Sequence, residues 1–178
     1  MNPLNSRYRA AWQIRSACAF ALVFALLPRA HADGGRTSPA QALPAYQQEC
    51  GSCHLAYPPG LLPASSWRRI MSGLDQHFGS DASLDAAMAQ QIGAWLQAHG
   101  GTTKKVDTAP PQDRITRSAW FERKHRRMPT AVWQHASVKS AANCVACHTG
   151  AAQGDFDEHR LRFPPGLDKR YQNVFRDD

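Results

Sequence analysis

The sequence predicts a mainly α-helical protein made of two small domains, and three observations support this fold class. Apolar residues recur at helical spacing in three segments, 65–79, 84–99 and 118–128. Residues 101–113 are rich in glycine, proline and polar side chains without apolar periodicity, which is typical of a linker. A Cys-x-x-Cys-His motif occurs once on each side of that linker, at 50–54 and at 144–148.

The first 32 residues are predicted to be a secretory signal peptide. Three arginines precede a short apolar run at 17–27, and Ala30 to Ala32 supply the small residues of a cleavage site. The run is about half the roughly 20 residues that a membrane helix needs. We therefore expect cleavage after Ala32, export to the periplasm and no stable membrane insertion. The alternative is that the segment stays uncleaved as an anchor.

Cleavage would change the charge of the chain, because Arg7, Arg9, Arg15 and Arg29 leave with the signal peptide. Removing these four arginines lowers the formal net charge from +7 to +3, so we expect no nucleic-acid partner. The remaining basic character is local. Residues 114–127 hold six basic side chains against one glutamate, which indicates either a solvated face or an electrostatic docking surface for a protein.

The linker divides the expected mature chain into an N-terminal domain, 33–100, and a C-terminal domain, 114–178. Domains this small bury little apolar surface and usually need a further stabilising element, such as a metal or a covalent cross-link. Cys18 lies in the signal peptide, so the four cysteines that remain all belong to the two motifs. The cysteines are therefore the candidates for this stabilising role.

The spacing of the motifs favours covalent haem over the other uses of paired cysteines. Structural zinc would place its ligand pairs close together, and a disulfide or redox pair does not explain a histidine after the second cysteine both times. Cys-x-x-Cys-His is the attachment signature of c-type haem, in which the histidine is the proximal iron ligand. We therefore predict two covalently bound haems c, with these residues as attachment points and proximal ligands: Cys50, Cys53 and His54; Cys144, Cys147 and His148.

The distal ligand of the first haem is predicted to be His77. A helix starting at Ser65 or Ser66 would carry an apolar stripe that includes Leu74, and His77 continues this stripe three residues later. Met71, Met88 and an open position are the alternatives. His99 lies in the last turn of the next predicted helix, 84–99, where it would complement the helix dipole.

The distal ligand of the second haem is predicted to be His125. A helix over 118–128, with Ser118 as its N-cap and Pro129 at its end, places His125 four residues after Phe121. The histidine can thus follow the aromatic residue into the domain. The alternatives are His159, His135, Met128 and an open position.

Histidine on both sides of each iron leaves no vacant position and favours a low reduction potential, because an axial methionine would raise it. Both consequences indicate an electron carrier that is not an enzyme. Two other functions stay open. One is a small haem enzyme that reduces peroxide, nitric oxide or oxygen through a displaceable ligand, and the other is a haem subunit of a larger oxidoreductase.

Four segments together closely resemble the dihaem cytochrome c family of bacterial periplasms: residues 46–85, 120-WFERKH-125, 143-NCVACH-148 and 154-GDFDEHRLRFP-164. The resemblance implies an N-terminal domain similar to class I cytochrome c and a small C-terminal haem domain of irregular helical fold. It also implies two histidine ligands at each haem, here His54 with His77 and His148 with His125. The implied partners are a small oxygen-binding monohaem cytochrome, which accepts electrons after electrostatic docking, and a membrane cytochrome b as donor.

Overall fold

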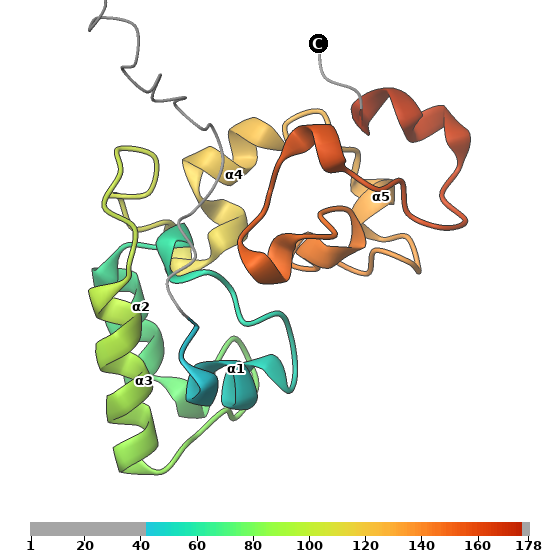
Figure 1. Cartoon of the computed structure of the whole chain (residues 1–178). Helices are drawn as coiled ribbons and strands as arrows, with labels where there is room; N and C mark the ends of the chain where they lie inside the picture. The colour runs from blue at the N-terminus through green and yellow to red at the C-terminus, as the bar shows by residue number, and fades with distance from the viewer. Residues whose placement is uncertain (1–41, 176–178) are drawn as a thin grey trace, which may run out of the picture. The chain divides into compact units, whose positions relative to one another are not determined.

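The structure is a computed structural model that describes residues 42–175, and the predicted signal peptide lies outside them. The fold is mainly helical, as predicted, and short 3₁₀ turns connect the helices (Figure 1). Within the described range no strand forms, and only two isolated β-bridges occur. The α-helices are α1 (Pro44–Gly51), α2 (Ala64–Ser72), α3 (Ala86–Ala98), α4 (Ala119–Lys124) and α5 (Thr130–Trp133).

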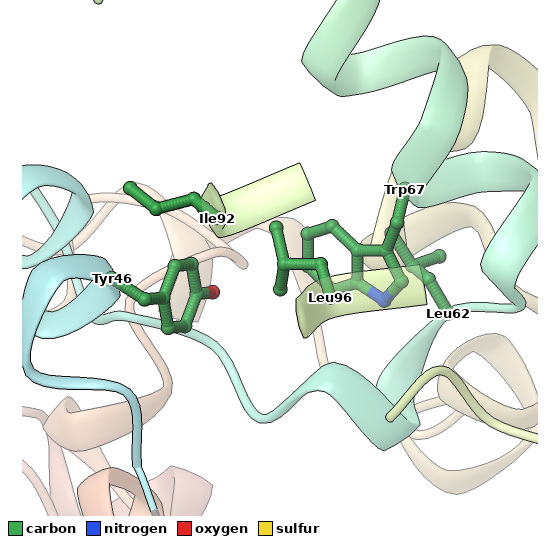
Figure 2. Close-up of a cluster of buried hydrophobic side chains, with 5 residues drawn as sticks. All are labelled: Tyr46, Leu62, Trp67, Ile92 and Leu96. Carbon is green, nitrogen blue, oxygen red and sulfur yellow. The ribbon is translucent and has the colours of Figure 1, made fainter. Parts of the chain in front are cut away.

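Helices α2 and α3 lie side by side and form the most regular part of the fold (Figure 1). The buried side chains between them and α1 form one apolar cluster, shown in Figure 2: Tyr46, Leu62, Trp67, Ile92 and Leu96. The indole nitrogen of Trp67 donates a hydrogen bond to the carbonyl of Pro59 at 2.7 Å, so the polar group of this buried ring is satisfied. The cluster packs directly against Cys50 of the first motif.

The chain from α2 to α3 differs from the prediction at its caps. Helix α2 begins after Pro63, which makes no side-chain capping bond, so the predicted N-cap at Ser65 or Ser66 was wrong; Ser66 is buried inside the helix. The helix also ends at Ser72, well before residue 79, and a 3₁₀ turn (Leu74–Gln76) leads to His77. The N-cap of α3 is Asp85, whose carboxylate accepts from the amide of Met88.

The second motif lies in a part of the chain with short helices. The predicted N-cap of α4 is confirmed, because the Ser118 hydroxyl accepts from the amide of Phe121 at 3.1 Å. The helix ends at Lys124, with His125 as its C-cap, and Pro129 caps α5. The buried cluster here is Val132, Val138, Ala146, Cys147 and Leu167. The turn of the second motif is thus part of the packed interior.

The segment predicted as a linker contacts the rest of the described chain at both of its ends. At its start, the amide of Gly101 donates to the carbonyl of Leu62 at 2.8 Å. At its end, Asp113 accepts two hydrogen bonds from the Arg69 guanidinium of α2, at 2.8 and 2.6 Å. Asp113 has a positive φ of 55°, which a non-glycine residue adopts only at some cost. No helix within residues 42–175 is long and apolar enough to span a bilayer.

Replacing Asp113 by asparagine is expected to lower the melting temperature by a few degrees at pH 7, because the bidentate ion pair with Arg69 is lost. The hydrogen bond from Arg69 lowers the pKa of Asp113 below its ordinary value. A carboxyl group with a lowered folded pKa stabilises fully above its unfolded pKa, about 3.9, and loses this contribution as the pH falls through the folded pKa. The difference in melting temperature between wild type and Asp113→Asn should therefore be smaller near pH 3 than at pH 7.

The matched control is Asp107→Asn, which makes the same chemical change at an exposed position of the same segment. We expect no change in its melting temperature. Equal melting of Asp113→Asn and wild type at pH 7 would show that the ion pair does not stabilise the fold.

Candidate functional site

The first Cys-x-x-Cys-His motif lies at the end of α1. Cys50 is in the last turn of the helix, and Ser52 keeps helical backbone angles (φ −66°, ψ −29°), which carries Cys53 and His54 onward along the same turn. Cys50 is half-buried, whereas Cys53 and His54 are exposed. Burial is the main reason that the pKa of Cys50 is raised, so this thiol is protonated at neutral pH.

His77 lies beside His54 in the folded chain. The two ring centroids are 6.1 Å apart and the ring planes are inclined by 18°. Two imidazoles bound to one metal from opposite sides give a centroid separation of roughly 6.3 Å, from metal–nitrogen bonds of about 2.0–2.1 Å and roughly 1.1 Å from nitrogen to centroid. The pair therefore has the separation that a metal between the rings requires.

The second Cys-x-x-Cys-His motif is built on a 3₁₀ turn (Cys144–Ala146) and not on an α-helix. The amide of His148 donates to the carbonyl of Cys144 at 2.8 Å, and this bond fixes the histidine relative to the first cysteine. Cys147 is buried in the apolar cluster of this half. Burial raises the pKa of Cys144 to about 11 and also raises that of Cys147.

His125 lies beside His148 in the same manner. Their ring centroids are 6.2 Å apart, but the ring planes are inclined by 75°. The His125 ring stacks on Phe121 at 4.0 Å and contacts Trp133 at 5.7 Å, so aromatic side chains hold it in place. The separation again fits a metal between the rings, and the two sites differ in the relative orientation of their imidazoles.

Two of the four histidines have hydrogen bonds that define their tautomer. His54 Nδ1 donates to the carbonyl of Leu55 at 2.7 Å, and His125 Nδ1 donates to the carbonyl of Phe121 at 2.9 Å. A carbonyl only accepts, so the proton of the neutral ring is on Nδ1 and the Nε2 lone pair is available. Metal-bound histidines typically make this outer hydrogen bond.

Burial also favours the neutral, metal-binding form of three of the four rings. Burial is the largest cause that lowers the pKa of His77 and of His125, and it contributes most to lowering the pKa of His148 to about 4. His148 Nδ1 is buried without a hydrogen-bond partner. An unpaired buried nitrogen is uncommon in native structures, and a functional role is one of the conditions under which it occurs.

The alternative ligands lie elsewhere. Met71 and Met88 pack against the first apolar cluster, and Met128 packs against the second. The His99 ring lies tilted against Trp95, with centroids 4.9 Å apart, and His135 contacts Ser137 through Nδ1. His159, in a 3₁₀ turn (Glu158–Arg160), is exposed. The structure brings His77 and His125 next to the motif histidines, while ligation itself stays a prediction.

Neither a disulfide nor a structural zinc site is formed by the cysteines in the described part of the chain. All four motif cysteines are free thiols. No group of three or more metal-binding side chains converges anywhere in residues 42–175, whereas structural zinc takes four ligands.

The contacts of aromatic residues with the histidine pairs were not predicted from the sequence. Tyr57 stacks on His54 at 5.1 Å, and Phe156 contacts His148 edge-on at 5.5 Å. Phe78 contacts His77 and lies under the guanidinium of Arg114. Tyr57 and Phe78 are close to a predicted ligand in the sequence, and this proximity is the signal that could have identified them.

Two histidine pairs at metal-spanning distance, each beside a Cys-x-x-Cys-His motif, define the class of a haem protein with two sites. The dihaem cytochrome c family matches residues 46–156, which is more than half of the chain. The chain therefore belongs to the dihaem cytochrome c family, and as such it is a haem protein for electron transfer with two haems.

Solved structures agree with this assignment. A diheme cytochrome type c from Shewanella baltica OS155 is 39% identical over 68% of this chain and 93% of its own, with a TM-score of 0.61. A diheme cytochrome c from Rhodobacter sphaeroides is 40% identical over 67% of this chain and 100% of its own, with a TM-score of 0.58. A search of curated proteins found no match.

Proposed function

We propose that the protein is a periplasmic electron relay in which both haems are covalently attached and both irons have two histidine ligands. The observation that carries the proposal is that each motif histidine lies beside a second histidine, with ring centroids 6.1 Å apart in the first pair and 6.2 Å in the second. The thiols would form the attachments as follows: Cys50 and Cys53 for the first haem, Cys144 and Cys147 for the second.

The residues of the chain account for a carrier function. When bound, haem supplies a one-electron couple between ferric and ferrous iron. His54 and His77 would hold the first haem, and His148 and His125 would hold the second, which would leave no coordination position for a substrate. The aromatic rings of Tyr57 and Phe121 stack on one histidine of each pair and restrict its movement.

The partners proposed for the relay are a small oxygen-binding monohaem cytochrome as acceptor and a membrane cytochrome b as donor. The basic run 114–127 is the proposed docking surface for an acidic partner. Two of its members already form ion pairs, Arg117 with Glu122 and Lys124 with Glu158, while His125 is turned toward His148. The arginines of the run other than Arg117 therefore have to supply most of the charge that a partner would meet.

Low-temperature electron paramagnetic resonance of the purified oxidised protein tests the proposal. We expect two low-spin ferric signals in equal amounts and no high-spin signal. Nearly parallel imidazole planes give a rhombic spectrum. Nearly perpendicular planes give a more anisotropic spectrum, whose largest g value is higher. The first site (18°) should therefore give the rhombic signal and the second (75°) the anisotropic one.

His77→Ala and His125→Ala identify which signal belongs to which site, with His99→Ala as the control. Each distal variant should lose one low-spin signal, and the control should keep both. A high-spin ferric signal in the wild-type protein would contradict two-histidine ligation and would favour the alternative of a small haem enzyme.

A further inference from the structure

We propose that Tyr57 is a positioning residue that joins the two haem sites and sets the rate of electron exchange between them. This inference rests on the proposed function, because it assigns a role to a residue between the two sites. Tyr57 belongs to neither Cys-x-x-Cys-His motif, yet it contacts His54 of the first motif and Ala142, which lies two residues before the second.

The first contact of Tyr57 is with the ligand pair of the first site. Its ring stacks on His54, with centroids 5.1 Å apart and planes inclined by 26°. His54 in turn faces His77. A shift of the Tyr57 ring would therefore change the packing of the histidine that is predicted to bind the first iron.

The second contact of Tyr57 is with Ala142, 85 residues along the chain and two residues before the second motif. The phenol hydroxyl donates a hydrogen bond of 2.7 Å to the carbonyl of Ala142. The same carbonyl accepts from the amide of Cys144 at 3.0 Å, and the Cys144 sulfur is 3.6 Å from it. One carbonyl oxygen thus joins Tyr57 to the first cysteine of the second motif.

The backbone of Tyr57 is itself fixed to the helix that carries the first motif. The hydroxyl of Tyr46, a buried residue of α1, donates to the carbonyl of Tyr57 at 2.7 Å. Two tyrosine hydroxyls therefore form a continuous connection from α1 through Tyr57 to Ala142. A carbonyl oxygen only accepts, so the Tyr57 hydroxyl is the donor in its bond to Ala142.

This connection gives Tyr57 a specific effect on the relay. Electron exchange between two redox centres depends steeply on their separation and on the bonded and hydrogen-bonded groups between them. The Tyr57–Ala142 hydrogen bond holds the turn of the second motif against the ligand pair of the first. Loss of the hydroxyl would let residues 142–147 move, while the ring would still stack on His54.

The test compares Tyr57→Phe with Tyr171→Phe in the haem-loaded protein. Both variants lose one hydroxyl. The Tyr171 hydroxyl accepts a hydrogen bond from the neighbouring Arg170 and takes no part in the contacts that join Tyr57 to His54 and Ala142. Two quantities are measured. One is the rate at which an electron injected by flash photolysis equilibrates between the haems, and the other is amide hydrogen exchange at residues 142–147.

We expect Tyr57→Phe to slow equilibration several-fold and to speed amide exchange at 142–147 about fivefold, as loss of one hydrogen bond predicts. Tyr171→Phe should change neither quantity. An unchanged equilibration rate in Tyr57→Phe, or an equal effect of Tyr171→Phe, would overturn the inference. Failure of the proposed function is recognised separately, because the wild-type protein itself would then lack two low-spin haems or show no exchange between them.

Discussion

Replacing all four motif cysteines by alanine is expected to abolish cooperative thermal unfolding and to remove most of the helical circular dichroism. The reason is the small apolar interior: each half has a buried cluster of five side chains, and the helices are short. Isolated helices of fewer than about 12–15 residues are marginal in water. Covalent haem would supply the apolar surface on which these elements pack.

The controls for this experiment keep one site at a time. The pair Cys50→Ala and Cys53→Ala should leave one haem per chain at the second motif, and the pair Cys144→Ala and Cys147→Ala should leave one at the first. Mass spectrometry of the exported protein counts the attached haems. A quadruple variant without haem that melts like wild type would show that the polypeptide folds without the cofactor.

Replacing His77 by methionine is expected to raise the reduction potential of one haem and to leave the other nearly unchanged. Methionine as an axial ligand favours ferrous iron, and axial ligands span roughly 0.8 V in haem proteins, so the increase should be a sizeable fraction of that range. Spectroelectrochemical titration of the two haems measures it directly.

The matched substitutions are His125→Met, which should raise the other potential, and His99→Met, which should raise neither. His99 is also a histidine at the end of a helix, but it is exposed and its ring lies tilted against Trp95. Two unchanged potentials in His77→Met would show that His77 is not a ligand of the first iron.

The sequence was sufficient to predict the helical class. The structure places His77 beside His54 and His125 beside His148, and their role as iron ligands stays a prediction. Residue spacing defines both motifs, and the Ser118 cap and the helix near 84–99 follow from local chemistry that the structure confirms in outline. His77 was predicted for a partly incorrect reason, because it reaches His54 through a 3₁₀ turn beyond Ser72 and not along one helical stripe.

The features that could not be predicted depend on contacts between distant residues. The Tyr57–Ala142 and Arg69–Asp113 hydrogen bonds join residues 85 and 44 positions apart, and neither is visible in local periodicity. The positive φ angle of Phe78 also has no local signal, because a bulky side chain usually avoids this region. Tertiary packing decides such conformations.

The close approach of Gly100 and Gly101 to the loop after the first motif affects how the protein can be divided for separate study. A side chain at Gly100 would come within 2.7 Å of the Ala64 backbone nitrogen, and one at Gly101 within 2.5 Å of the Gly60 carbonyl oxygen. The chain at these glycines packs closely against residues 60–64 and does not act as a hinge. Val106 is buried just beyond them. A truncated N-terminal fragment should accordingly include these glycines and Val106, and should end only after Asp113 and Ile115, which contact Arg69 and the first apolar cluster.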